Sequence, residues 1–272
     1  MLSVPQNEVA YIELERNRKI ARRLNMVLGV LAFTFIILAM LFVGYYSYTK
    51  YVQRQETPEQ KEIAKATKDI RDNPRNSSAR VRLGVLYMQA GQVDDAIDQF
   101  DEALKIARDD QEALLYAGIA YMNKEQYEKA LTYFNKLIKY YRNTALAGTN
   151  PSLEQSYYYG AVAYWKLKDY DHALDYVIKA LQIKASNSDS HLLAGRIYMD
   201  KKQNDEAITA FQQALRLDPA YPDALYGMGL AYEAKGDKAK ALENYKAALK
   251  AKPDFQPAKD AVARIQKTDK KT

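Results

Sequence analysis

The most prominent feature of the hydrophobic pattern is an apolar stretch near the N-terminus. Residues 24–49 carry no charge over 26 positions and are apolar on every face that a helix would present. A helix of this length extends about 39 Å at ~1.5 Å per residue, which exceeds the ~30 Å hydrocarbon core of a bilayer. The pattern therefore predicts a transmembrane helix over 24–49 rather than the core helix of a soluble domain.

Basic residues flank this stretch unequally, which predicts its orientation. By the positive-inside rule, residues 1–23 form a basic cytoplasmic segment and the rest of the chain is exported. A cleaved signal peptide is the alternative. It needs an apolar run of only ~7–15 residues and a small-residue cleavage site, which does not follow this run. The flanking basic residues are Arg16, Arg18, Lys19, Arg22 and Arg23 before the stretch, against Lys50 and Arg54 soon after it.

Beyond residue 76 the pattern changes to a regular repeat. A small residue is followed three positions later by Tyr, and Ala stands nine positions after that Tyr. The tyrosines are spaced by 34, 43, 34 and 34 residues, so one junction holds nine extra residues, 145–153. Such a period indicates pairs of helices that bury their apolar faces by stacking on the next pair. The tyrosines and alanines are Tyr87 with Ala96, Tyr121 with Ala130, Tyr164 with Ala173, Tyr198 with Ala207, and Tyr232 with Ala241.

These residues resemble the tetratricopeptide repeat (TPR) family over residues 77–255. The departures are Leu137 in place of a small residue, and a terminating proline only at Pro219 and Pro253. The resemblance implies an all-α fold: a single N-terminal transmembrane helix, then a right-handed TPR α-solenoid of five repeats with a C-terminal capping helix. The units are 77–110, 111–144, 154–187, 188–221 and 222–255, and their bulky residues four positions after the alanine are Phe100, Phe134, Val177, Phe211 and Tyr245.

The segments outside the repeats are expected to cap the solenoid. Thr57-Pro58-Glu59-Gln60 is a capping box with Pro in the first turn, so 50–76 is interpreted as a juxtamembrane linker and a capping helix that ends near Asp72. Residues 256–272 supply a C-terminal capping helix and a tail. Ser152 and Gln155 form a second capping box, which restarts the helix after the nine extra residues. Those nine residues are either a tolerated surface loop or a hinge or partner contact.

The composition argues against catalytic and metal chemistry. The chain has no Cys and only two His, His172 and His191, and neither has further metal ligands at helical spacing. The sequence contains no glycine-rich phosphate loop, G-x-S-x-G or H-E-x-x-H motif. The net charge of +6 includes the basic flank of the apolar stretch, and the region after it is nearly balanced. We therefore expect no enzymatic activity, cofactor, metal, nucleic-acid partner or small-molecule substrate.

In the TPR family the first helix of each unit lines a concave groove, so the resemblance implies a peptide-binding surface there. The family's groove positions give this chain an apolar, aromatic centre, with acidic residues toward the C-terminal end. The alternative is that some of these side chains only pack against neighbouring helices. The carboxylate clamp of one TPR subtype is not matched, because Val81 and Val85 stand where it needs Lys and Asn. The groove residues are Arg82, Met88, Tyr116, Ile119, Met122, Asn123, Tyr158, Tyr159, Val162, Trp165, Lys166, Leu192, Arg196, Met199 and Tyr226.

The layout is similar to that of N-terminally anchored TPR proteins of bacterial envelopes. It implies a single-pass protein of the plasma (inner) membrane, with a cytoplasmic N-terminus and an extracytoplasmic TPR domain. That domain would act as a scaffold or adaptor that binds peptide segments or partner proteins and assists assembly, secretion or maturation of envelope proteins. The alternatives are an organelle import-type receptor whose cytosolic repeats bind targeting peptides, and a structural TPR protein that self-assembles.

Overall fold

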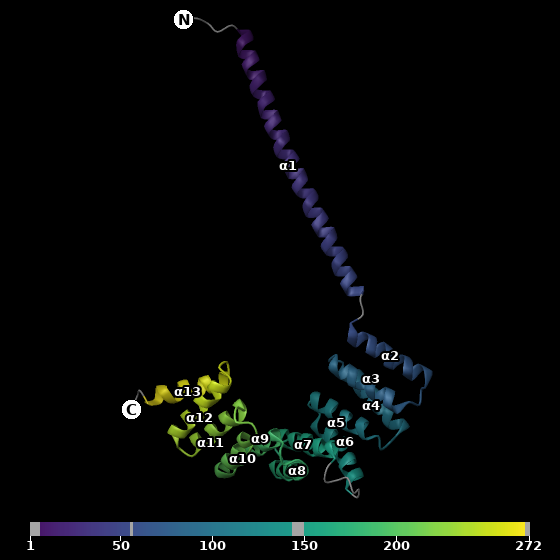
Figure 1. Cartoon of the computed structure of the whole chain (residues 1–272), viewed down its shortest axis with the longest axis vertical. Coiled ribbons are helices and arrows are strands. Elements are labelled where there is room, and N and C mark those ends of the chain that lie inside the picture. The colour runs from purple at the N-terminus through teal and green to yellow at the C-terminus, as the bar shows by residue number, and fades with distance from the viewer. Residues whose placement is uncertain (1–5, 55–56, 143–149, 270–272) are drawn as a thin grey trace. The chain divides into compact units, whose positions relative to one another are not determined.

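The structure is a computed structural model that describes residues 6–54, 57–142 and 150–269 (Figure 1). These residues form thirteen α-helices, and no strand occurs among them. The prediction of an all-α chain is therefore confirmed. The chain divides into two compact units, Met1–Lys61 and Glu62–Thr272, which are described one at a time.

The first unit consists largely of α1 (Gln6–Arg54), a helix of 49 residues. Its segment Arg23–Tyr48 is long and apolar enough to cross a membrane, judged by length and composition. The large apolar side chains of this segment are exposed, with Phe35 at 73% and Leu38 at 63%. A helix that is apolar on every face has no polar side to turn toward water when it packs on a core.

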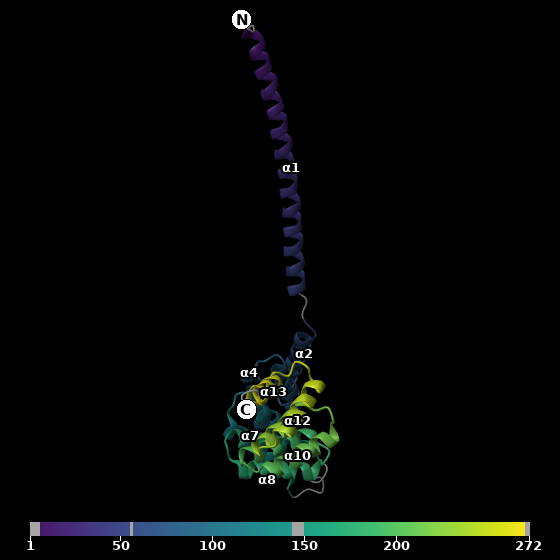
Figure 2. The ribbon, with the colours of Figure 1, turned by 90° about the vertical axis from the view of Figure 1, so that its left-hand side faces the viewer.

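The second unit contains the helix pairs that the 34-residue period predicts. Helices that follow one another in the chain pack together, and the first helices of neighbouring repeats also contact one another. Their succession can be followed in Figure 1 and, turned by 90°, in Figure 2. The pairs are α3 (Ser77–Gln89) with α4 (Val93–Ile106), α5 (Gln111–Asn123) with α6 (Tyr127–Tyr141), α7 (Pro151–Lys166) with α8 (Tyr170–Ile183), α9 (Ser188–Asp200) with α10 (Asn204–Leu217), and α11 (Pro222–Ala234) with α12 (Lys238–Ala251).

Each pair is closed by a small residue on its first helix against a larger one on its second. A Cβ atom added to Gly118 would lie 2.4 Å from Cε1 of Phe134, so only glycine lets the two helices approach this closely. In the third unit both residues change together, since Ala161 and Val177 are buried at the same positions. The other glycine–aromatic pairs are Gly84 with Phe100, Gly195 with Phe211, and Gly229 with Tyr245.

The turn between the two helices of every unit has the same backbone form. The residue after the helix cap has a positive φ, and the N–H of the following residue bonds the carbonyl five residues earlier, for example from Gln203 to Tyr198 at 2.9 Å. This is the Schellman ending of a helix, which glycine adopts with least strain. Only two of the five residues at this position are glycine, Gly91 and Gly236. The other three are Glu125, Lys168 and Lys202.

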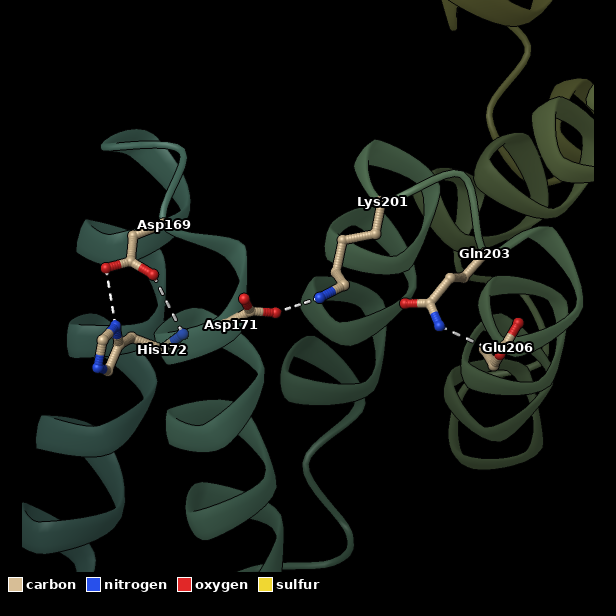
Figure 3. A network of polar contacts seen from close by, with 6 residues as sticks. All are labelled: Asp169, Asp171, His172, Lys201, Gln203 and Glu206. Carbon is tan, nitrogen blue, oxygen red and sulfur yellow. Dashed lines mark hydrogen bonds and ion pairs between the residues drawn. The ribbon is translucent and has the colours of Figure 1, made fainter.

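Lysine–aspartate pairs join consecutive units at a fixed register (Figure 3). Lys201, at the end of α9, donates to Asp171, the second residue of α8. The same register joins Lys124 to Asp94 and Lys235 to Asp205. Between the second and third units the positions hold Leu167 and Glu128, so that junction lacks the pair. Figure 3 also shows His172 against Asp169, at 2.8 Å from Nδ1 to Oδ2, and Gln203 donating to Glu206 at 3.3 Å.

The predicted capping box at residues 57–60 is confirmed, and the one at Ser152 and Gln155 is wrong. The Thr57 and Gln60 side chains each bond the other's backbone N–H, at 3.2 and 3.0 Å, and α2 (Pro58–Asp72) begins there. The helix α7 is capped by Asn150, whose side chain accepts from the N–H of Leu153 at 3.0 Å, and not by the Ser152 and Gln155 pair. An Asn before Pro forms the stronger cap here, because Pro fits the first helical position. Residues 143–149, including most of the nine extra residues, lie outside the described part.

The helix α13 (Gln256–Asp269) covers the C-terminal end of the solenoid, in the segment where a capping helix was predicted. It packs against α12, and Ala258, Ala261 and Ile265 of α13 are buried. The Arg264 guanidinium also pairs with Glu233 of α11 at 2.7 Å. The apolar side of the last repeat is therefore shielded, as a solenoid end requires.

Candidate functional site

A pocket of about 290 Å³ lies between the first helices of the last three repeats and the start of α13. Four of the predicted groove residues line it, namely Trp165 of α7, Arg196 and Met199 of α9, and Tyr226 of α11. They come together because the family's groove positions recur at a 34-residue spacing and the first helices pack side by side. Further lining residues are Asp200, Phe211, Asp223, Leu230, Phe255 and Pro257.

The pocket walls are held in place by contacts between neighbouring repeats. The indole N–H of Trp165 donates to Oδ2 of Asp200 at 2.6 Å, which orients the ring from the next unit. Lys166 lies over the same ring, with Nζ 5.3 Å from its centroid. Tyr226 packs edge-on against Phe255, with centroids 5.6 Å apart. The apolar walls therefore do not depend on a bound ligand for their orientation.

The charged groups at the pocket are arranged in pairs. Arg196 donates to Oδ1 of Asp223 at 2.7 Å, and both side chains are partly exposed. An exposed pair of this kind adds little to stability. A carboxylate has more acceptor sites than one donor fills, so Asp200 and Asp223 can each accept a further N–H. The pocket thus combines an apolar interior with acceptors at its rim.

Two tyrosine side chains that interact with Asp189, at the start of α9, stay protonated far into the alkaline range. Burial raises the pKa of Tyr158 to about 12, and the negative charge of Asp189 acts in the same direction. Burial also raises the pKa of Tyr221, whose hydroxyl donates to Asp189. At neutral pH these groups are hydrogen-bond donors and carry no charge.

Apart from Trp165, the predicted groove residues of the first three units lie outside this pocket, and many pack between repeats. Tyr116 stacks on the buried Phe100 and Tyr159 on the buried Phe134, each with centroids 6.1 Å apart. Tyr158 packs edge-on to Tyr159 at 5.3 Å. Met88, Ile119, Met122 and Val162 are half-buried against the same repeat cores, whereas Asn123 and Lys166 are exposed. Arg82 pairs with Asp69 of α2 at 2.6 Å.

One predicted groove residue is a core residue. Leu192 is only 6% exposed and packs with Phe211 and Ala224, so the prediction that it lines the groove is corrected. The family position alone does not specify this, because burial depends on the size of the neighbouring side chains. Phe255 and Pro257 were not predicted, since Phe255 is the last residue of the fifth unit and Pro257 lies in the first turn of α13, and neither holds one of the family's groove positions. The only available signal was that a capping helix must fold back over the last unit.

Each of the two histidines contacts a polar group that lies near it in the chain. His172 lies in the first turn of α8 beside Asp169, and Nε2 of His191 lies 3.0 Å from the carbonyl oxygen of Ala185. In the part of the chain that the structure describes, no group of three or more His, Asp or Glu side chains could hold a metal ion.

Comparison with protein-family models identifies the repeats. Tetratricopeptide repeat models match residues 70–113, 81–151 and 222–255, and a TPR repeat model matches 195–236. A model for anaphase-promoting complex, cyclosome, subunit 3 matches 123–214. The chain belongs to the tetratricopeptide repeat family. No curated protein sequence matches it.

Solved structures of other TPR proteins share the fold. YrrB, described as a TPR protein with an unusual peptide-binding site, is 26% identical, with a TM-score of 0.58 over 72% of this chain and 96% of YrrB. MamA from Desulfovibrio magneticus RS-1 is 22% identical, with a TM-score of 0.59 over 66% and 97% of the two chains. A chain of the Cut9–Hcn1 hetero-tetramer of the APC/C is 18% identical, with a TM-score of 0.60 over 75% of this chain and 39% of that one.

Proposed function

We propose that this chain is a membrane-anchored TPR scaffold, without catalytic activity, that binds a peptide segment of a partner protein in the pocket beside Trp165. The observation that carries the proposal is the convergence of four groove residues, from three consecutive repeats, on one apolar pocket. YrrB, which has the same fold, is described as having a peptide-binding site.

The pocket favours a peptide over a free small molecule. Its volume of about 290 Å³ is just below the ~300–1,000 Å³ range of small-molecule sites, so it fits one large apolar side chain. Asp200 and Asp223 at the rim offer acceptors for the backbone N–H groups of an extended segment. Rigid aromatic side chains are common among the residues that contribute most to protein binding.

Site-specific crosslinking tests this proposal. A photoreactive amino acid replaces Met199, which lines the pocket, and in a matched control it replaces Lys246, which is exposed on α12. We expect a defined protein adduct in native membranes from position 199 and none from 246. Adding Trp165→Ala should reduce the adduct at least tenfold per folded molecule, because a buried aromatic anchor contributes ~2 kcal/mol or more. Equal adducts from both positions, or an adduct unaffected by Trp165→Ala, would contradict the proposal.

The membrane part of the proposal rests on α1, whose segment Arg23–Tyr48 exposes apolar side chains on all faces. The surplus of basic residues before it favours a cytoplasmic N-terminus and exported repeats. Protease added to intact spheroplasts should then digest the repeats, and a fragment of the first ~50 residues should stay with the membrane. Repeats that become sensitive only after permeabilisation would reverse the orientation, and a chain recovered in the soluble fraction would exclude the anchor.

A further inference from the structure

The grooves between the second helices of neighbouring repeats differ along the solenoid. At the junction of the first two repeats, Tyr133 of α6 packs against Tyr121 with centroids 5.3 Å apart, and its hydroxyl donates to Asp101 of α4 at 2.8 Å. At the next junction, Tyr176 of α8 packs edge-on to Tyr164 at 5.0 Å and donates to Asn135 of α6 at 2.5 Å. In both cases a tyrosine ring occupies the part of the groove beside the first helix, and its hydroxyl bonds the preceding repeat. At the first junction a separate pocket of about 650 Å³ stays open further along, between Leu104 of α4 and Lys136, Lys139 and Tyr140 of α6.

The third junction has neither member of this arrangement. Ala210 of α10 stands at the position of Tyr133 and Tyr176, and Ile178 of α8 stands at the position of the polar acceptor. The result is an open groove of about 370 Å³ between α8 and α10, with Tyr198 of α9 in its lining. Ile178 is 45% exposed there. This second-helix groove is separate from the concave pocket and shares no lining residue with it.

The rim of the second-helix groove carries more negative than positive charge. Asp205 and Glu206, in the first turn of α10, both line it. Lys235 pairs with Asp205, and Glu206 accepts a hydrogen bond from the uncharged Gln203. One carboxylate is therefore not balanced by a cation in these contacts, which favours a basic residue in whatever binds.

We propose that the second-helix groove is a second binding site, which takes a phenylalanine side chain of a partner polypeptide that has a basic residue beside it. The chain itself indicates the occupant, because an aromatic ring fills the equivalent space at two other junctions. Phenylalanine fits better than tyrosine, since Ile178 offers no acceptor for a hydroxyl and a buried unpaired hydroxyl is costly. The basic neighbour would meet Asp205 and Glu206.

The probe for this site is an acetylated Lys-Phe-Lys amide with a fluorine on the ring, titrated into the full chain in lipid nanodiscs and followed by fluorine NMR. We expect saturable binding, at least fivefold weaker binding of the Tyr analogue, and none of an Ala analogue. Trp165, the only Trp of the chain, lines the concave pocket, so its fluorescence should not change on binding. A fluorescence change that parallels the fluorine signal would assign the probe to the concave pocket and overturn the proposal.

Two sets of variants decide the location. The pair Ile178→Asp and Ala210→Tyr copies the closed first junction and should abolish binding while the melting temperature is kept, and Ala210→Phe alone fills the groove if the pair does not fold. The reverse pair, Asp101→Ile and Tyr133→Ala, should open an equivalent groove and raise the stoichiometry from one to two. Undiminished binding to a folded, filled variant, or no saturable binding to the unaltered chain, would overturn the proposal. The concave pocket would be unaffected by either result.

Discussion

The apolar segment of α1 and the repeat helices contain similar large apolar side chains, but these are exposed in α1 and buried in the repeats. Phe35 in α1 is 73% exposed, whereas Phe134 in α6 is fully buried. The difference lies in the pattern, since the repeats place a small residue such as Gly118 opposite each large one and keep a polar face. The segment of α1 is apolar all round, so its side chains do not divide into a buried face and a solvated face. Apolar content alone therefore says little about where a helix resides.

The largest effect should come from truncating the buried ring. Phe134→Ala removes a side chain packed at the centre of the second repeat and should lower the free energy of unfolding by about 3–5 kcal/mol. Phe35→Ala is the matched control and should leave the unfolding of the repeats unchanged. Urea unfolding followed by circular dichroism measures both, and equal losses would break the comparison.

Replacing one glycine in the repeats and one in α1 should give the next largest difference in stability. Gly118→Ala places a Cβ 2.4 Å from Phe134 and forces the helices apart, at a cost of about 1–3 kcal/mol. Gly29→Ala in α1 meets no atom within 4 Å and should not destabilise its helix. Melting curves of the two variants test this, and a Gly118→Ala protein as stable as the parent would show that the close approach is not required.

Tyr133 should have a smaller, pH-dependent effect. Tyr133→Phe loses the hydrogen bond to Asp101, which is worth about 1 kcal/mol at neutral pH. Burial and the Asp101 carboxylate raise the pKa of Tyr133 above its ordinary value of 10.0. A raised pKa in the folded state means that the stability is complete below pH 10 and falls as the pH rises further. The variant should therefore lose less stability between neutral pH and strongly alkaline pH than the parent, and an identical pH profile would contradict this.

The smallest effect is expected at the ion pairs between repeats. Lys201→Ala should cost about 0.2–1 kcal/mol and the loss should shrink in high salt, because Asp171 is exposed. Leu167→Lys offers the reverse change, since it places a cation opposite Glu128 at the junction that lacks the pair. A loss above this range, or one that is insensitive to salt, would mean that Lys201 acts through packing.

The repeat period, the start of α2 and the C-terminal helix could be predicted because they follow from local patterns. Residues 57–60 and the five tyrosines mark helix starts and packing positions without reference to any neighbour. The cap of α7 was mispredicted because Ser152 and Gln155 match the capping-box spacing, while Asn150 and Pro151 form the better cap two residues earlier.

The site was predictable only in part, since it depends on contacts between repeats. Trp165 and Tyr226 follow from the family's groove positions, but the burial of Leu192 depends on Phe211 and Ala224 around it. The second-helix groove could be predicted from the sequence, but not from any one repeat alone. It appears only when Ala210 and Ile178 are compared with their counterparts in the other units.

The order of helix contacts has a consequence for how the chain is made. In the described part of the second unit, the main helix contacts join neighbours or next-but-one neighbours in the chain. Contacts this local in sequence close short loops, so their entropic cost is small and folding is fast. Each repeat can therefore fold against the preceding one soon after it leaves the ribosome, and α13, which emerges after the repeats, covers the apolar side of the fifth one. Synthesis and assembly thus proceed in the same direction along the chain.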